Sequence, residues 1–169
     1  MSLAFDFSGK KVLITGGRSG IGRDIVNEFI SSSANVTFTS REPLSGSDIK
    51  ALSVATHLQL NVSKPADRKK LFEWADAERF YPDIIINNAG LTKDSLLLRM
   101  KSNQWEDVIT TNLSSNYYIL NEKKNKKIIR FKKKSFSGMI LNDLLKEYTV
   151  GIGTICLNKN IFKHYSFNN

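Results

Sequence analysis

The chain has 169 residues and a formal net charge of +9, and 41% of its residues are hydrophobic. This length suits one domain with a buried core. Its single cysteine and two widely separated histidines exclude a disulfide framework and a zinc site built from these residues. The first residues do not have the pattern of a signal peptide, and no window is apolar enough for a membrane span, so we expect a cytoplasmic protein.

The charge divides the chain into two parts. Residues 1–116 carry 14 Lys+Arg and 13 Asp+Glu, whereas residues 117–169 carry 11 and 3. Nearly all of the positive charge therefore belongs to the last third, which is also rich in Lys and Asn. This asymmetry predicts a boundary near Asn116.

Strands and helices alternate over the first 90 residues. We expect helices over Gly20–Ser32 and Asp67–Phe80, and strands over Lys11–Thr15, Asn35–Ser40, His57–Val62 and Asp83–Asn87. Ser63 is a candidate N-cap for the second helix, with Pro65 in its first turn. Such apolar runs, separated by helices, are typical of an α/β fold whose parallel sheet is covered on both faces.

The most informative stretch follows the first expected strand. It reads Thr15-Gly16-Gly17-Arg18-Ser19-Gly20-Ile21-Gly22. A strand that feeds a glycine-rich turn and then a helix holds a diphosphate at the helix N-terminus. Gly16 permits a sharp turn, Gly20 allows backbone N–H groups to approach an anion, and Gly22 allows the helix to pack tightly on the sheet. A plain glycine-rich turn is the alternative, and the strand and helix on either side disfavour it.

A longer amphipathic helix is expected from Ser102. Its apolar positions recur at helical spacing and are Trp105, Val108, Ile109, Leu113 and Tyr117. Asn112 lies on the same stripe, where its amide requires a buried partner or an ordered water. A purely structural amide and a functional one are both possible on this pattern.

Three motifs together resemble those of the short-chain dehydrogenases/reductases: Thr15–Gly22, Asn87-Asn88-Ala89-Gly90 and Asn112. Within that family, residues 88–100 and 105–113 are most similar to the bacterial 3-oxoacyl-acyl-carrier-protein reductases, and the resemblance runs from about Phe7 to Ser115. It implies a truncated Rossmann-like, doubly wound parallel sheet. Residues 1–116 would form its dinucleotide-binding half, and residues 117–169 a basic tail with a helix and one strand.

The resemblance also implies roles for individual residues. The diphosphate and the adjacent ribose would be lined by Gly16, Ser19, Gly20, Ile21 and Gly22. The adenine would be contacted by Asn61 and Val62, where the family often has an aspartate before the valine. Asn88, Ala89 and Gly90 would lie beneath the nicotinamide ribose, and Asn87 would tie the fourth strand to its neighbours. Asn112 matches the catalytic asparagine, which holds a water in the proton relay.

The choice of cofactor follows from the end of the second strand. An acidic residue there would bind the ribose hydroxyls of NAD and repel a 2′-phosphate. This chain has Ser40 followed by Arg41, and Arg18 lies in the glycine-rich turn. Because a guanidinium binds phosphate through two hydrogen bonds, we expect NADP and its reduced form NADPH. Two ordinary surface arginines are the alternative.

The catalytic motif of the family is absent from these 169 residues. In the family a tyrosine donates a proton to the carbonyl, a lysine four residues later lowers the tyrosine pKa, and a serine orients the substrate. No tyrosine of this chain has a lysine four residues later. We therefore expect an oxidoreductase-like chain that reduces an acyl thioester or another carbonyl compound poorly. The alternative is a non-catalytic nucleotide-binding fragment or a fusion product.

The basic tail admits several interpretations. Residues 121–134 carry eight Lys and Arg residues against Glu122, with little aromatic interleaving, so a solvated charge run is favoured over an RNA-binding patch. We expect a helix over 138–148 and a strand over Thr149–Leu157 that pairs in parallel beside the fourth strand. The tail is also faintly similar to the middle of family-2 glycosyltransferases, and a gene fusion or a deletion would explain both similarities.

The family resemblance implies one exposed face. The helix that holds Asn112 normally packs against the helix of the missing tyrosine and against a second subunit. Without that cover, Trp105, Ile109, Leu113 and Tyr117 would be exposed. We therefore expect marginal stability and self-association.

Overall fold

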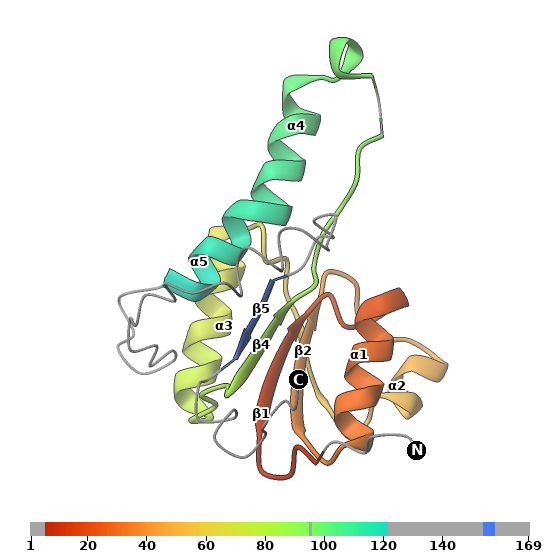
Figure 1. Cartoon of the computed structure of the whole chain (residues 1–169), viewed down its shortest axis with the longest axis vertical. Coiled ribbons are helices and arrows are strands. Elements are labelled where there is room, and N and C mark those ends of the chain that lie inside the picture. The colour runs from red at the N-terminus through yellow and green to blue at the C-terminus, as the bar shows by residue number, and fades with distance from the viewer. Residues whose placement is uncertain (1–5, 95, 122–153, 158–169) are drawn as a thin grey trace, which may run out of the picture.

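The computed structural model describes residues 6–94, 96–121 and 154–157 (Figure 1). In chain order the elements are β1 (Lys11–Thr15), α1 (Gly20–Ser31), β2 (Asn35–Ser40), α2 (Ser47–Ala51), β3 (Thr56–Gln59), α3 (Pro65–Ala77), β4 (Ile84–Asn87), η1 (Leu97–Arg99), α4 (Ser102–Ile109), η2 (Thr110–Ser114), α5 (Ser115–Asn121) and β5 (Thr154–Leu157). The alternation expected from the sequence is confirmed over the first 90 residues.

The sheet has the strand order β3-β2-β1-β4-β5, and its first four strands are parallel. Val12 of β1 lies opposite Val36 of β2 and Ile84 of β4. From β1 the chain thus adds β2 and β3 on one side, and it then crosses to the other side of β1 to form β4. A sheet that reverses direction in this way is Rossmann-like, and its ligand site lies where the order reverses, between β1 and β4.

The expected fifth strand does pair with β4, but the expected direction is wrong. β5 runs antiparallel, with Leu157 opposite Ile84 and Thr154 opposite Asn87. The run of apolar residues gave no directional signal, because side chains alternate identically along a strand in either direction, and antiparallel pairing is slightly more stable per residue. Residues 149–153 of the expected strand lie outside the described residues.

Two local expectations near α3 need correction. The N-cap of α3 is Lys64 and not Ser63, with Pro65 in the first turn as expected. β3 ends at Gln59 and not at Val62. The backbone N–H of Asn61 donates to Oδ2 of Asp67 at 2.9 Å instead of pairing with β2, so the chain leaves the sheet before Val62.

Two apolar layers cover the sheet, one on each face. Val12 and Ile14 of β1 pack with α1 and with β2 on one face, whereas Leu13 packs with residues of α3 and α5 on the other. The alternation of side chains along a buried parallel strand accounts for this division. Figure 1 shows α1 and α2 on one side of the sheet and α3 and α5 on the other, which confirms the expected doubly wound arrangement.

The helical segment formed by α4, η2 and α5 extends from the sheet (Figure 1). Its apolar stripe is only partly covered: the exposed fractions are 50% for Trp105, 64% for Leu113 and 60% for Tyr117, whereas Ile119 is buried. Among the helices of the described ranges, none is both long and apolar enough to span a membrane.

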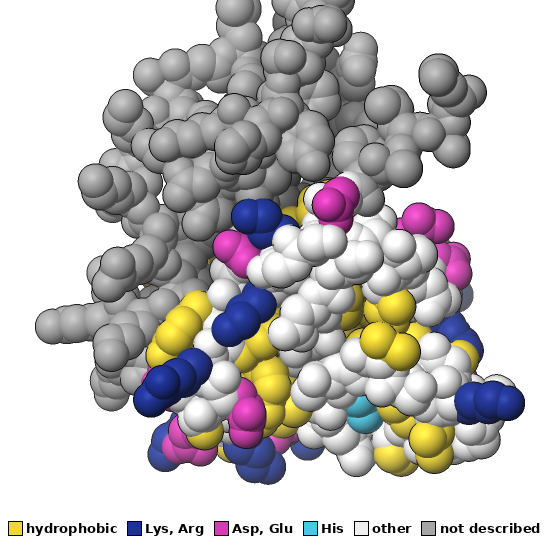
Figure 2. Space-filling model, turned by 90° about the horizontal axis from the view of Figure 1, so that it is seen from below, with side chains coloured by type: hydrophobic (Ala, Val, Ile, Leu, Met, Phe, Trp, Pro, Cys, Tyr) yellow, Lys and Arg dark blue, Asp and Glu magenta, His cyan; other side chains and the backbone are white. Residues whose placement is uncertain are grey.

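Charges are mixed on the surface of the first part of the chain. Seen from below, Lys and Arg side chains lie beside Asp and Glu side chains (Figure 2). This agrees with the near balance of charge over residues 1–116. The basic run from residue 122, the helix expected over 138–148 and the glycosyltransferase-like part of the tail lie outside the described residues.

Candidate functional site

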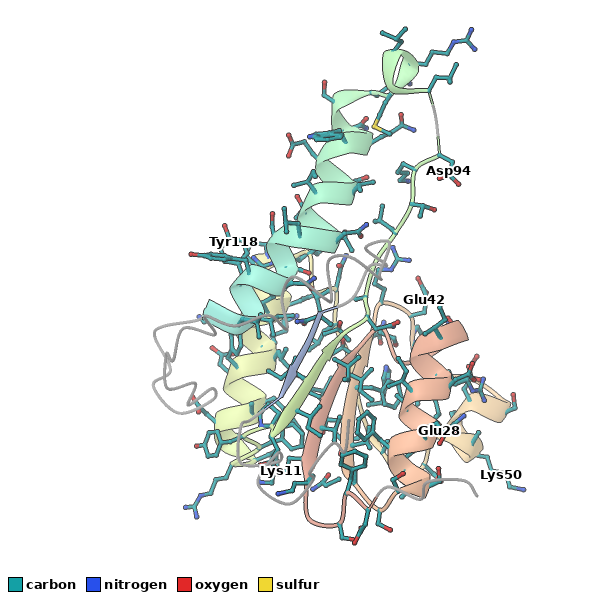
Figure 3. The ribbon with its side chains drawn as sticks, viewed as in Figure 1. Lys11, Glu28, Glu42, Lys50, Asp94 and Tyr118 are labelled. Carbon is teal, nitrogen blue, oxygen red and sulfur yellow. The ribbon has the colours of Figure 1, made fainter. Side chains whose placement is uncertain are left out.

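An open cleft of about 290 Å³ lies at the C-terminal ends of the parallel strands. Figure 3 shows Glu42, one of its lining residues, at the end of the sheet opposite to Lys11. The lining residues are Gly16, Arg18, Ser19, Ile21, Gly22, Thr39, Ser40, Arg41, Glu42, Leu60, Asn61, Val62, Asn88, Ala89, Gly90 and Thr111. The structure thus brings together every residue expected to bind the cofactor except Gly20, although four separate loops contribute them.

Hydrogen bonds between Thr15 and Asn88 fix the floor of the cleft. The fully buried Thr15 accepts hydrogen bonds at Oγ1 from the backbone N–H groups of Asn88 (3.1 Å) and Ala89 (3.0 Å). In return, Nδ2 of Asn88 donates to the carbonyl oxygens of Thr15 (3.1 Å) and Gly16 (3.0 Å). The segment after β4 is therefore joined to the glycine-rich turn.

The glycines make this join possible. A Cβ at Gly22 would overlap the carbonyl of Gly16 and the side-chain amide of Asn88. Gly16 has a φ of +72°, in the left-handed region that side chains other than glycine disfavour. Gly20 opens α1 with a φ of +54°, and no atom lies within 4 Å of its Cβ position. Ser19, Ile21 and Gly22 line the cleft, so the N-terminus of this 12-residue helix borders it, and a helix N-terminus favours an anion.

Basic side chains lie beside the end of β2. Nε of Arg18 is 3.5 Å from Oδ2 of Asp48 in α2, and Nη1 of Arg23 is 2.7 Å from Oδ1 of the same carboxylate. Asp48 thus forms an ion pair with Arg18, although Nε of Arg18 is buried without a hydrogen-bond partner among the described residues. Arg41 is exposed, and its guanidinium forms no hydrogen bond or ion pair with the described residues, so it is available to an anion.

His57 supports the end of β2, which the sequence analysis did not anticipate. Oγ of Ser40 donates to the carbonyl oxygen of Glu42 at 2.6 Å, and it therefore accepts a hydrogen bond from Nε2 of His57 at 2.8 Å. The His57 ring also packs on Phe38, with 5.0 Å between the ring centroids. Burial, and secondarily the positive charge of Arg18, lower the pKa of His57 below its usual value. Because β2 pairs with β3 so that Phe38 lies opposite His57, knowledge of this register could have indicated that His57 lies near Ser40.

Asn112 lies in the π-helical turn η2 and binds the loop after β4 through two hydrogen bonds. Its Oδ1 accepts from the backbone N–H of Leu91 at 2.9 Å, and its Nδ2 donates to the carbonyl oxygen of Leu91 at 3.0 Å. Its own carbonyl oxygen accepts from Nδ2 of Asn116 at 2.8 Å. The neighbouring Thr111, and not Asn112, lines the cleft. The amide thus has the partner that its position required, and its catalytic role stays a prediction.

Among the described residues, Asn87 links β4 to its neighbours through its backbone and not through its side chain. It is fully buried, and neither Oδ1 nor Nδ2 has a hydrogen-bond partner among the described residues. Backbone pairing of Asn87 with Thr15 is what joins β4 to β1 at this point.

Comparison with known proteins gives the family. The model of the short chain dehydrogenase family matches residues 10–142, which is most of the chain and continues past residue 116. The chain belongs to the short-chain dehydrogenase family. It is 37% identical over 137 residues to the 3-oxoacyl-acyl-carrier-protein reductase of Salmonella typhimurium, and 37% identical over 138 residues to that of Escherichia coli. Each match covers 80% of this chain and 54% of the relative, so the chain spans about half the length of these relatives.

Two solved structures are also similar. A short-chain dehydrogenase from Leptospira borgpetersenii with bound NAD+ is 28% identical, with a TM-score of 0.60, and the match covers 66% of this chain and 43% of that one. A 4-hydroxyisoleucine dehydrogenase complexed with NADH is 27% identical, with a TM-score of 0.58, and the match covers 64% and 45%. Both of these proteins hold a nicotinamide dinucleotide, NAD+ in the first and NADH in the second.

The lowered pKa of His57 predicts a pH dependence of stability. Below an ordinary histidine pKa of 6.5, the unfolded chain takes up a proton at this position more readily than the folded chain. The contribution of His57 to the free energy of unfolding should therefore be complete above that pH. It should decrease as the pH falls. Replacement of the imidazole in His57→Gln should make this decrease shallower between about pH 7.5 and 5. Urea titrations across this range measure it, and equal slopes in the two proteins would exclude His57 as the cause.

Proposed function

We propose that the chain binds NADPH in this cleft and is an oxidoreductase-like protein similar to the 3-oxoacyl-acyl-carrier-protein reductases. The observation that carries the proposal is the cleft itself, where the glycine-rich turn, the end of β2 and the Asn88–Gly90 segment face one another. The residues fit a dinucleotide: Gly16 and Gly22 allow the close turn, and the start of α1, where Ser19 and Ile21 line the cleft, would accept a diphosphate.

Preference for NADPH over NADH rests on the end of β2. Ser40 lies where an acidic residue would bind the ribose hydroxyls, and the guanidinium of Arg41, which has no partner among the described residues, would bind a 2′-phosphate. Arg18, which pairs with Asp48, adds a second positive charge. Glu42 also lines the cleft. Its carboxylate would oppose the phosphate, so the affinities measured below decide which charge dominates.

Catalysis by these 169 residues should be weak. When bound, a reduced nicotinamide supplies a hydride to a carbonyl carbon. The carbonyl oxygen then requires a proton from a donor of suitable pKa. The sequence contains no Tyr-x-x-x-Lys to provide it, although an acyl thioester or another carbonyl compound is the substrate class that the relatives' name indicates. This absence favours the second candidate function, a non-catalytic nucleotide-binding fragment or a fusion product with a glycosyltransferase-like tail.

We propose that the chain self-associates. Trp105, Leu113 and Tyr117 are exposed along α4, η2 and α5. Burial of such side chains is favourable by roughly 1.5–3 kcal/mol each, so a second copy is an energetically suitable cover. The cytoplasmic location and the division of the chain at residue 116 remain predictions from the sequence.

The first test replaces the arginine expected to bind the phosphate. Arg41→Asp should weaken NADPH binding and favour NADH relative to the parent, because a phosphate partner becomes a repulsive carboxylate. Calorimetric titration with both cofactors measures the change. Equal affinity of the parent chain for NADPH and NADH would show that Arg41 is not a phosphate ligand.

The second test measures turnover. With a 3-oxoacyl thioester as substrate, the rate of NADPH oxidation should be at least about a thousandfold below that of an ordinary family member, because loss of essential catalytic groups typically costs this much or more. A turnover near about 10 per second, a usual enzyme value, would contradict the proposal and require another proton donor.

A further inference from the structure

Residues 60–62, the cleft wall after β3, are held by side chains from the start of α3. Leu60, Asn61 and Val62 line the cleft after the chain has left β3. The backbone N–H of Asn61 donates to Oδ2 of Asp67 at 2.9 Å, and the carbonyl oxygen of Val62 accepts from Nη1 of Arg68 at 2.7 Å. Two consecutive residues of α3 thus satisfy backbone groups of the wall that lie outside the sheet.

Arg68 is a buried cation with an exposed fraction of 6%. A guanidinium in that state needs partners that compensate for the water it has lost. Besides the carbonyl oxygen of Val62, one such partner is an aromatic ring. Cζ of Arg68 lies 4.6 Å from the centroid of the Tyr118 ring, within the range of a cation–π interaction. The Tyr118 ring thus holds the guanidinium from the side of α5.

Tyr118 belongs to the helical segment that also carries Thr111. α5 continues directly from η2, and Oγ of the buried Ser115 donates to the carbonyl oxygen of Thr111 at 2.6 Å. Thr111 itself lines the cleft. Figure 3 shows Tyr118 on this segment, beside α3. Through Tyr118 and Arg68, the helical segment is thus connected to a second part of the cleft, the wall at Val62.

We propose that Arg68 is a positioning residue for nucleotide binding: it holds the cleft wall at Val62, and the ring of Tyr118 holds Arg68 in turn. The inference rests on the proposed binding of NADPH. Arg68 and Tyr118 lie outside the set of residues that line the cleft, so their effect on affinity passes through the backbone of the wall. The planar guanidinium suits this role because it can donate to a carbonyl and stack on a ring at the same time.

The test measures the affinity of the full 169-residue chain for NADPH by calorimetric titration, with thermal melts to confirm that each variant is folded. Tyr118→Leu removes the ring face from a side chain that is 46% exposed, so the dissociation constant should rise about threefold or more. Tyr118→Phe keeps the ring and should bind NADPH within about twofold of the parent. Equal weakening in both variants would overturn the inference, because the ring face would then not be what matters.

A purely structural role of Tyr118 gives a different result. It would lower the melting temperature of Tyr118→Leu and leave the dissociation constant of the folded protein unchanged. That outcome would overturn the inference and leave the proposed function intact. Absence of NADPH binding by the parent chain would overturn both.

Trp105→Leu is the matched control. It makes the same aromatic-to-leucine change on the same helical segment, at a side chain of similar exposure, 50% against 46% for Tyr118. Trp105 is not a lining residue of the cleft, so this variant should bind NADPH like the parent. A rise equal to that of Tyr118→Leu would show that a general change in the helical segment or in self-association alters binding, and it would overturn the inference.

A double-mutant cycle tests whether Tyr118 acts through Arg68. Arg68→Met keeps an apolar stem and removes the guanidinium, so the dissociation constant should rise by about tenfold. In this background Tyr118→Leu should change it by less than about twofold, because the ring has lost its partner. Multiplication of the two single effects would overturn the inference. If Arg68→Met does not fold, the comparison of Tyr118→Leu with Tyr118→Phe and Trp105→Leu still decides.

Discussion

The hydroxyl of Thr15 joins the ends of β1 and β4, and the shape of the cleft depends on that join. It accepts two backbone N–H groups from the segment after β4, while Asn88 returns two hydrogen bonds to the glycine-rich turn. A parallel sheet that reverses its strand order opens a crevice at this point, and the crevice needs walls that keep a fixed separation. Because an unpaired buried N–H costs about 1–3 kcal/mol, the two segments hold each other in place. The absence of a Cβ at Gly22 then lets α1 begin close to the same junction.

Much of this arrangement could be predicted from the sequence because local chemistry encodes it. The apolar runs gave the four parallel strands, and the glycine spacing gave the turn between β1 and α1. The contacts between loops were less accessible, since they depend on which strands become neighbours. His57 reaches Ser40 only because β3 pairs with β2, and Asp48 reaches both Arg18 and Arg23 from a short helix that the sequence marks weakly.

The sequence was least informative about two features: the direction of β5 and the hydrogen bonding of the Asn87 side chain. By its apolar pattern a short strand can pair in either direction, and the expectation that residues 138–148 form a crossover favoured the parallel one. The structure has the antiparallel register, with Thr154 opposite Asn87. The amide of Asn87 is buried there without a hydrogen-bond partner among the described residues. A buried polar group in that state destabilises the fold. Together with the exposed Trp105 and Leu113, it agrees with the expectation of marginal stability.

Binding of NADPH to two valine variants tests the central claim most directly. Thr15→Val removes the hydroxyl that joins the two walls, whereas Thr37→Val removes a buried hydroxyl on β2 that has no partner among the described residues. Both substitutions keep the shape of the side chain. Calorimetric titration should give a dissociation constant for Thr15→Val at least about tenfold above that of the parent, with Thr37→Val close to the parent. Equal affinity of both variants would contradict the account.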